Sequence, residues 1–395
     1  DLRYFIVVLI LDTSKIFINS KHPLALLYKS LLSLGKDLSL IINPSILNEA
    51  ALLIIEPMFL GSVTSSKATK VILVLFSIVL FSANVSAADM RIALVVKGLG
   101  IGFFEAAAEG GQEAAEDIGG VEVIYTGPAT TTAEEQIEVI NSLIAQKVDA
   151  IAISANDRDA LVPIGKKAME RGITVISWDS GIGEEGRIMN LDPSNTALIG
   201  SSNIKWMKNS MGDEGEFAIL SATSQATNQN AWIEEMKKEF AKPEYSKMKW
   251  VDTVYGDDLF DKSYQEALGL FKKYPNLKGI IAPTSVGIVA AAKAVEDQGL
   301  VGKVFITGLG LPSEMQAHVK SGAAVQFGIW NPIDLGYSAV YLSYQIASGK
   351  YKGEEGECIP VGRMGEICIG EGNSAAMADP FVFDISNIDK FAKIF

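Results

Sequence analysis

The chain has 395 residues, 48% hydrophobic and 21% charged, so it is long enough for two or three globular domains and is neither disordered nor collagen-like. Its 34 Lys and Arg face 47 Asp and Glu, and the net charge of −13 argues against nucleic acid as a partner. Two Cys and two His leave little material for a zinc site, so we expect neither a metal nor a cofactor.

Residues 58–87 are typical of a secretory signal peptide. Lys67 and Lys70 precede an uncharged run of 13 residues, and the small residues of Val85-Ser86-Ala87 follow it. A membrane-spanning helix would need roughly 20 apolar residues. We therefore predict cleavage near Ala87 and a secreted protein. No Cys stands directly after the apolar run, so we expect no lipid anchor.

The preceding segment, 1–57, does not fit a signal peptide, which should begin near its own initiator. The chain starts with Asp1, and its first Met is Met58. The apolar runs of 1–57 show no sustained helical or strand period. We predict that 1–57 is a non-native upstream extension; the alternative is an unusual N-terminal membrane segment. N-terminal sequencing of the native protein distinguishes the two.

From Asp89 onward, short apolar runs alternate with helical stretches. The predicted strands are 91–97, 121–125, 150–154, 174–177, 217–220, 250–255, 279–282, 304–307 and 325–329. The helices predicted most clearly are 103–118, 133–146 and 159–171, the first stopped by Gly119-Gly120.

This alternation is typical of right-handed βαβ units and parallel sheets. We predict an α/β fold of two Rossmann-like lobes: 89–192 plus 311–348, and 193–310 plus 349–395. Ligands of such sheets bind beyond the carboxyl ends of the strands.

The first strand ends in a glycine-rich turn. Gly98, Gly100 and Gly102 invite a dinucleotide-binding interpretation, but Phe103 stands where that motif needs its third glycine, and no acid follows the second strand. The turn instead brings Lys97 and the rings of Phe103 and Phe104 to the cleft. The alternative is that at least one of these rings only packs the helix.

Polar and aromatic side chains follow the later strands. Asp179 stands beside Trp178, a pair suited to bind sugar hydroxyls and sugar C–H faces. The alternative is that Trp178 is a core residue and Asp179 caps a turn. The remaining candidate ligand-binding residues are Asn228, Gln229, Pro283, Ser285, Trp330 and Asn331. Amides, hydroxyls and indoles suit a neutral polyhydroxylated ligand better than a phosphate or a metal ion.

Catalytic motifs are missing after residue 88. The one His there, His318, falls in a predicted surface helix, and no nucleophile elbow, zinc-protease or phosphate-loop motif occurs. Asp157 and Asp179 both lie at strand ends and could form a glycosidase pair if they faced one another. We expect a binding protein rather than an enzyme.

Cys358 and Cys368 flank a predicted hairpin around Gly362–Gly365. An oxidising compartment permits a disulfide, and two buried free thiols remain the alternative.

Residues 91–395 resemble the type I periplasmic sugar-binding proteins of ABC transporters, the ribose-binding-like group. The stretches most similar to its rhamnose-binding members are Ile92–Lys97, Val139–Asn156, Ala226–Asn230, Ala282–Ile288 and Gly308–Met315.

The autoinducer-2 binding proteins resemble the chain next. They hold their ligand with a Lys, two Asp, a Gln, a Pro and an Ala. The matching positions are Lys97, Asp179, Asn228, Gln229, Pro283 and Ser285. Asn228 stands in place of an Asp and Ser285 in place of an Ala, departures that favour a deoxyhexose over autoinducer-2.

The resemblance implies two lobes joined by a hinge of three crossovers, a sugar enclosed between them, and docking on a permease powered by a separate ATPase. It implies a monomer. A chemotaxis or quorum-signal receptor would share the fold. A transcription regulator with the same lobes would need a DNA-binding headpiece, which we do not expect here.

Overall fold

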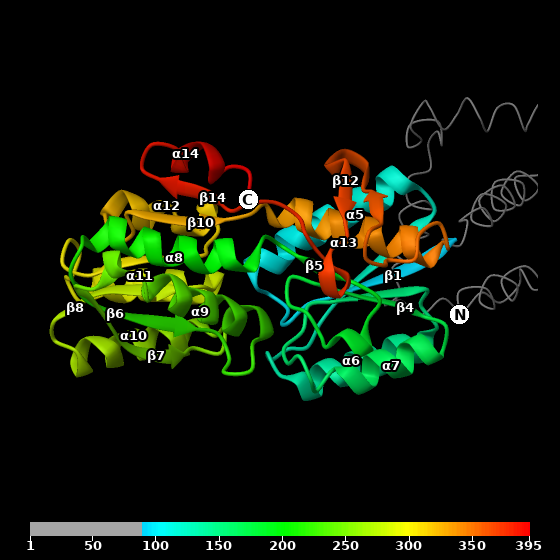
Figure 1. The fold of residues 1–395 in the computed structure, drawn as a ribbon, viewed down its shortest axis with the longest axis horizontal. Coiled ribbons are helices and arrows are strands. Elements are labelled where there is room, and N and C mark those ends of the chain that lie inside the picture. Colours follow the sequence, from blue (N-terminus) through cyan, green and yellow to red (C-terminus); the bar gives the residue numbers. More distant parts are fainter. Residues whose placement is uncertain (1–88) are drawn as a thin grey trace, which may run out of the picture. The chain divides into compact units, whose positions relative to one another are not determined.

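The computed structural model describes residues 89–395, so the signal peptide predicted over 58–87 and the extension predicted over 1–57 lie outside the described residues. Strands and helices alternate along most of the described chain (Figure 1). Between residues 89 and 395, no helix is both long and apolar enough to cross a membrane.

The first of the two main sheets has six parallel strands in the order β13-β5-β4-β3-β1-β2. The strands are β1 (Met90–Val95), β2 (Val121–Thr126), β3 (Ala150–Ile153), β4 (Thr174–Trp178), β5 (Asn190–Asp192) and β13 (Ser374–Ala376). Its helices are α5 (Gly102–Ile118), α6 (Ala133–Gln146), α7 (Val162–Glu170) and α13 (Pro332–Ala347), with the 3₁₀ turn η2 (Glu184–Gly186).

Helices cover both faces of this sheet, with α5 and α13 on one face and α6 and α7 on the other (Figure 1). Successive strand residues point to opposite faces. Ile92 and Leu94 accordingly join the core that contains α5 and α13, whereas Ala93 and Val95 join the core that contains α6 and α7. Burial on both faces explains why β1 reads as a continuous apolar run instead of an alternating one.

The second sheet has four parallel strands in the order β7-β6-β8-β9. They are β6 (Gly215–Ser221), β7 (Met248–Tyr255), β8 (Leu277–Ala282) and β9 (Phe305–Gly308). Single bridges attach β10 (Gln326–Ile329) beside β9, and β14 (Phe381–Asp384) pairs with β10 antiparallel. The helices here are α8 (Thr196–Met211), α9 (Thr227–Phe240), α10 (Phe260–Lys273), α11 (Ser285–Asp297), α12 (Pro312–Ser321) and α14 (Ile388–Phe391), with η3 (Pro243–Tyr245).

The prediction of two parallel α/β sheets is confirmed. The chain passes between the sheets three times: between β5 and α8, between β10 and α13, and between β13 and β14. Each sheet with its helices is called a lobe below, the first lobe being the one that contains β1.

The predicted lobe boundaries need correction at two places. Residues 311–330 were assigned to the first lobe, but α12 packs against α11 and β10 bridges to β9, so this segment belongs to the second. Residues 349–377 were assigned to the second lobe, but β13 completes the first sheet beside β5. Arg187 secures that return by donating to the carbonyl oxygens of Gly372 and Asn373 at 3.3 and 3.1 Å.

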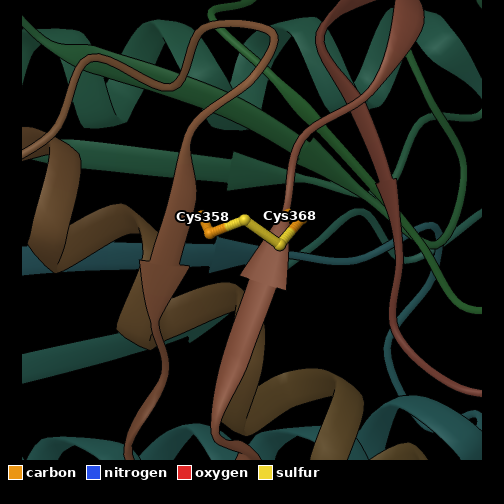
Figure 2. The surroundings of a disulfide bond; sticks show 2 residues. All are labelled: Cys358 and Cys368. Carbon is orange, nitrogen blue, oxygen red and sulfur yellow. A yellow bond between two sulfur atoms is a disulfide. The ribbon is translucent and has the colours of Figure 1, made fainter.

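A disulfide closes the hairpin of β11 (Cys358–Pro360) and β12 (Glu366–Cys368), whose turn contains η4 (Gly362–Met364) (Figure 2). Cys358 and Cys368 are directly opposite in the antiparallel register, and their sulfurs are 2.00 Å apart. Of the two alternatives that the sequence left open, the structure has the disulfide. After the hairpin the chain turns through η5 (Glu371–Asn373) into β13.

Candidate ligand-binding site

One cavity gathers most of the predicted ligand-binding side chains from both lobes. It lies beyond the carboxyl ends of β1 and β4 in the first lobe and of β6, β7 and β8 in the second, as parallel sheets dictate. Nine of the ten predicted residues line it: Lys97, Phe103, Phe104, Asp179, Asn228, Gln229, Pro283, Ser285 and Trp330. We call this the inner cavity.

A buried polar chain crosses the inner cavity from one lobe to the other. Lys97 Nζ donates to Asn228 Oδ1 at 2.8 Å, and Asn228 Nδ2 lies 3.4 Å from Asp179 Oδ1. All three side chains are less than a tenth exposed. Buried charges persist only when they are paired and hydrogen-bonded, and both charged groups of this cluster have a buried hydrogen-bond partner and face an opposite charge.

The first-lobe members of this chain are fixed by further hydrogen bonds. Ser154 Oγ donates to Asp179 Oδ2 at 2.7 Å, and the backbone at Asp179 has φ of 60°, which presents the carboxylate at a sharp turn. Asn156 Nδ2 donates to the Lys97 carbonyl at 2.9 Å, and Asn156 N donates to the buried side chain of Gln136 at 3.0 Å. Ser154, Asn156 and Gln136 thus set the position of the two charged groups.

Burial dominates the electrostatics of the charged groups. It lowers the pKa of the Lys97 ammonium, and the carboxylates of Asp179 and Asp258 partly oppose that shift. It raises the pKa of Asp179, opposed by Lys97 and by the Ser154 hydroxyl. It also raises the pKa of Asp258, again opposed by Lys97. One cation therefore faces two carboxylates, an arrangement with no surplus positive charge for an anionic ligand.

Aromatic rings form a continuous series from the first-lobe core, where Trp178 is fully buried, into the lining of this cavity. Phe104 meets Trp178 edge-on at 5.9 Å between ring centroids, Phe103 meets Phe104 at 5.2 Å, and Phe103 meets Trp330 at 6.2 Å. Trp232 adds a further edge contact with Trp330 at 5.7 Å. Phe103 and Phe104 are both buried, so they pack the helix and line the cavity at once.

Two polar atoms in this lining make no hydrogen bond within the described residues. These are Gln229 Oε1 and Trp330 Nε1, in side chains that are 5% and 3% exposed. Buried polar atoms are nearly always paired, and unpaired ones carry a desolvation cost. One acceptor and one donor are therefore available to a polar ligand, which is the chemistry of a hydroxyl group.

Asp258 and Trp232 line the inner cavity but were missed as site residues. Asp258 follows β7, and it accepts a hydrogen bond from Thr284 Oγ1, which follows β8. Asp258 stands three residues after the predicted strand 250–255, so its place beyond a strand end is the signal that identifies it. Trp232 stands one helical turn after Asn228, on the face of α9 that meets the cavity.

Asn331 does not line the inner cavity, contrary to the prediction. Its Oδ1 accepts from the backbone N–H of Ile333 at 3.0 Å, and its Nδ2 donates to Asp334 at 2.7 Å, so it caps α13. Asp157 likewise accepts from the N–H groups of Asp159 and Ala160, both at 2.9 Å, and does not pair with Asp179. Among residues 89–395, no cluster of His, Cys, Asp and Glu could bind a metal ion.

Two hinged α/β lobes that enclose a polar and aromatic cavity define a class of solute-binding proteins. A family model described as periplasmic binding protein domain matches residues 92–351, and the chain belongs to this family. The family comprises binding proteins of transport systems, which confirms the prediction that the chain is not an enzyme and implies an extracytoplasmic location.

Similar proteins of known structure or function fit this assignment. An ABC transporter solute-binding protein of Clostridium phytofermentas, solved with bound L-rhamnose, is 37% identical, with TM-score 0.75, covering 78% of this chain and 100% of its own. LsrB of Clostridium saccharobutylicum, in complex with AI-2, shares the fold at 22% identity and TM-score 0.72, covering 76% and 99%. The D-ribose/D-allose-binding protein of Pseudomonas aeruginosa is 25% identical over 59% of this chain and 74% of its own.

Proposed function

We propose that the protein captures a neutral deoxyhexose, L-rhamnose, in the inner cavity and delivers it to a membrane permease driven by a separate ATPase. The observation that carries this proposal is the buried Lys97–Asn228–Asp179 chain, which joins the two lobes across an aromatic lining. A sugar offers hydroxyls to such a chain and C–H faces to such rings.

The relation to the rhamnose-bound protein of Clostridium phytofermentas supports the choice of sugar, since it is 37% identical over 78% of this chain. The charge of the lining supports a neutral ligand. Lys97 is its one cation, and two carboxylates already face that cation, so a phosphorylated sugar would meet net repulsion. The unpaired Gln229 Oε1 and Trp330 Nε1 would gain hydrogen bonds from ligand hydroxyls.

Closure of the lobes follows from the same contacts. A sugar placed between Lys97 and Asn228 replaces one direct bond between the lobes with several that pass through the ligand. Because the ligand then contacts both lobes, it stabilises the closed arrangement by its differential affinity for it. The three crossovers between the lobes are the segments that would bend.

Calorimetric titration of the purified protein tests the proposal, with L-rhamnose as the ligand and ribose, galactose and autoinducer-2 as competitors. We expect one-to-one binding of L-rhamnose that the other two sugars displace poorly. Heat with ribose or galactose and none with L-rhamnose would contradict the choice of sugar. No heat with any of the four would contradict the proposed site.

Autoinducer-2 is the second candidate, because Asp258 restores a second carboxylate to the cavity. The amide at Asn228, where the autoinducer-2 binding proteins have an acid, by itself disfavours autoinducer-2. With Asp258 in the lining, the cavity again holds a Lys, two Asp and a Gln. Binding of autoinducer-2 without L-rhamnose would make the protein a receptor or importer of that signal.

The remaining parts of the proposal concern location and assembly. We expect a periplasmic protein released by cleavage near Ala87, without a lipid anchor, and N-terminal sequencing of the exported protein checks the cleavage site. We expect a monomer, since the site is complete within one chain. Size-exclusion chromatography with light scattering distinguishes a monomer from a dimer.

A further inference from the structure

A second cavity adjoins the inner one and opens outward between the lobes. This outer compartment has a volume of about 350 Å³ and is lined by the turn Gly98–Gly102, by Thr131, by Leu259 and Phe260, and by Val286 and Val289 of α11. Ile101, Asp258 and Ser285 border both cavities, so the two lie side by side and share part of their lining. The volume is within the range of small-molecule sites.

Three large apolar side chains in the lining of the outer compartment are exposed to solvent. Leu99 of the first lobe is 46% exposed, and Leu259 and Phe260 of the second are 50% and 43% exposed. These are among the few large apolar side chains of residues 89–395 that stand so far into solvent. Apolar side chains gathered at a concave surface mark a binding site more often than scattered ones do.

Charge and backbone geometry limit which chemical groups can occupy the outer compartment. The only ionisable groups in this lining are the acids Asp258 and Glu314, which excludes an anionic group from favourable binding. Gly100 has φ of 79°, and a Cβ added there would meet nothing within 4 Å, so the turn leaves open space above its backbone. The space suits a neutral group with an apolar face.

We propose that the outer compartment binds a neutral substituent carried on one oxygen of the sugar in the inner cavity, so that the physiological ligand is a substituted sugar. The substituent is a second sugar ring or an apolar aglycone, each of which presents a flat apolar face to Phe260 and Leu259. This inference rests on the proposed function, because the inner cavity must hold the sugar to which the substituent is joined.

Derivatives of the sugar test the inference. Once the titration panel has shown which free sugar binds, its mono-O-benzyl derivatives are compared with the mono-O-methyl derivatives at the same oxygens. We expect one benzyl derivative to bind at least about fivefold more tightly than its methyl counterpart, because its ring is removed from water against Phe260. A disaccharide linked at that oxygen then shows whether a sugar ring or an aryl group is preferred.

Two variants test whether the benzyl preference arises in the outer compartment. Phe260→Ser and Leu259→Ser should each reduce the benzyl preference while leaving the affinity for the free sugar unchanged within about twofold, since neither side chain lines the inner cavity. Ile385→Ser is the matched control, an apolar residue of the second lobe that is 67% exposed and lines neither cavity. It should change neither affinity.

Three outcomes overturn the inference. If the free sugar binds but every derivative is rejected, the bound sugar is sealed from the outer compartment. If the benzyl preference survives both Phe260→Ser and Leu259→Ser, the ring lies elsewhere. If no sugar of the panel binds, the proposed function fails and this inference fails with it.

Discussion

The two sides of the inner cavity differ in how far their polar groups are already fixed. On the first-lobe side, Ser154 anchors the Asp179 carboxylate and Asn156 anchors the Lys97 turn. On the second-lobe side, Gln229 Oε1 and Trp330 Nε1 have no hydrogen-bond partner within the described residues. The first side is thus a preorganised surface, and the second has polar groups that a ligand can satisfy.

This difference predicts the order in which a sugar contacts the two lobes. A sugar should meet the preorganised first-lobe side first, since little ordering is needed there. Bonds to the second lobe should then form on closure and slow the release of the sugar. Changes on the first side should therefore abolish binding, whereas changes on the second should weaken it mainly through faster dissociation.

Asp179→Ala should have the largest effect. Removing this carboxylate leaves the Lys97 ammonium facing one carboxylate, Asp258, instead of two, and removes an acceptor for sugar hydroxyls, so we expect affinity to fall at least about 100-fold. Calorimetry measures the affinity, and circular dichroism checks that the fold is intact. Asp157→Ala, at another first-lobe strand end outside the cavity, is the control. Retained affinity in the Asp179 variant would place the site elsewhere.

Gln229→Ala should have a smaller effect on affinity, and it tests the second-lobe side of the inner cavity. One hydrogen bond that forms only with ligand is lost, so we expect roughly tenfold weaker binding. The thermal stability should change little, because Gln229 Oε1 has no bond to lose within the described residues. Stopped-flow fluorescence should assign the change to dissociation. The exposed Gln225→Ala is the control, and a purely association-limited loss would contradict the proposed order.

Removing the disulfide should affect stability but not binding. The Cys358–Cys368 hairpin lies against the first lobe, where Arg363 pairs with Asp334 at 3.1 Å and lies over the Tyr337 ring at 4.1 Å. Cross-linking a loop of this length should contribute roughly 2–3 kcal/mol. We expect Cys358→Ser with Cys368→Ser to lower the free energy of unfolding by about that amount, measured by urea titration. A changed affinity for the sugar would show that the hairpin acts on the site.

The smallest effect concerns pH. Because burial raises the pKa of Asp179 in the folded protein, its contribution to stability is fully present below the unfolded value near 4 and is lost as pH rises through the folded pKa. Asp179→Asn removes this titration. The free energy of unfolding is measured against pH for the unsubstituted protein and for the variant. The first minus the second should decrease as the pH rises, by at most about 1.4 kcal/mol per pH unit. A difference that grows with pH would contradict the direction of the shift.

The sequence by itself determined the alternation of strands and helices and most of the site. Continuous apolar runs such as 150–154 are strands buried on both faces, and their polar neighbours at the carboxyl ends must meet at one edge of a parallel sheet. That local rule was enough to bring Lys97 and Asp179 to one edge of the first sheet. Gln229 belongs to the second lobe, and only the family resemblance placed it opposite them.

Only the tertiary structure decided which lobe each late segment joins and what Asn331 and Asp258 do. β5 and β13 have three residues each, too few for a periodic signal, and they are strands because each finds a hydrogen-bond partner far away in the chain. From the sequence alone, Asn331 is predicted to be a ligand-binding amide. In the structure its side chain caps the N-terminus of α13 instead. Asp258 enters the site because the turn after β7 meets Thr284 beyond β8, a contact between segments that sequence periodicity does not relate.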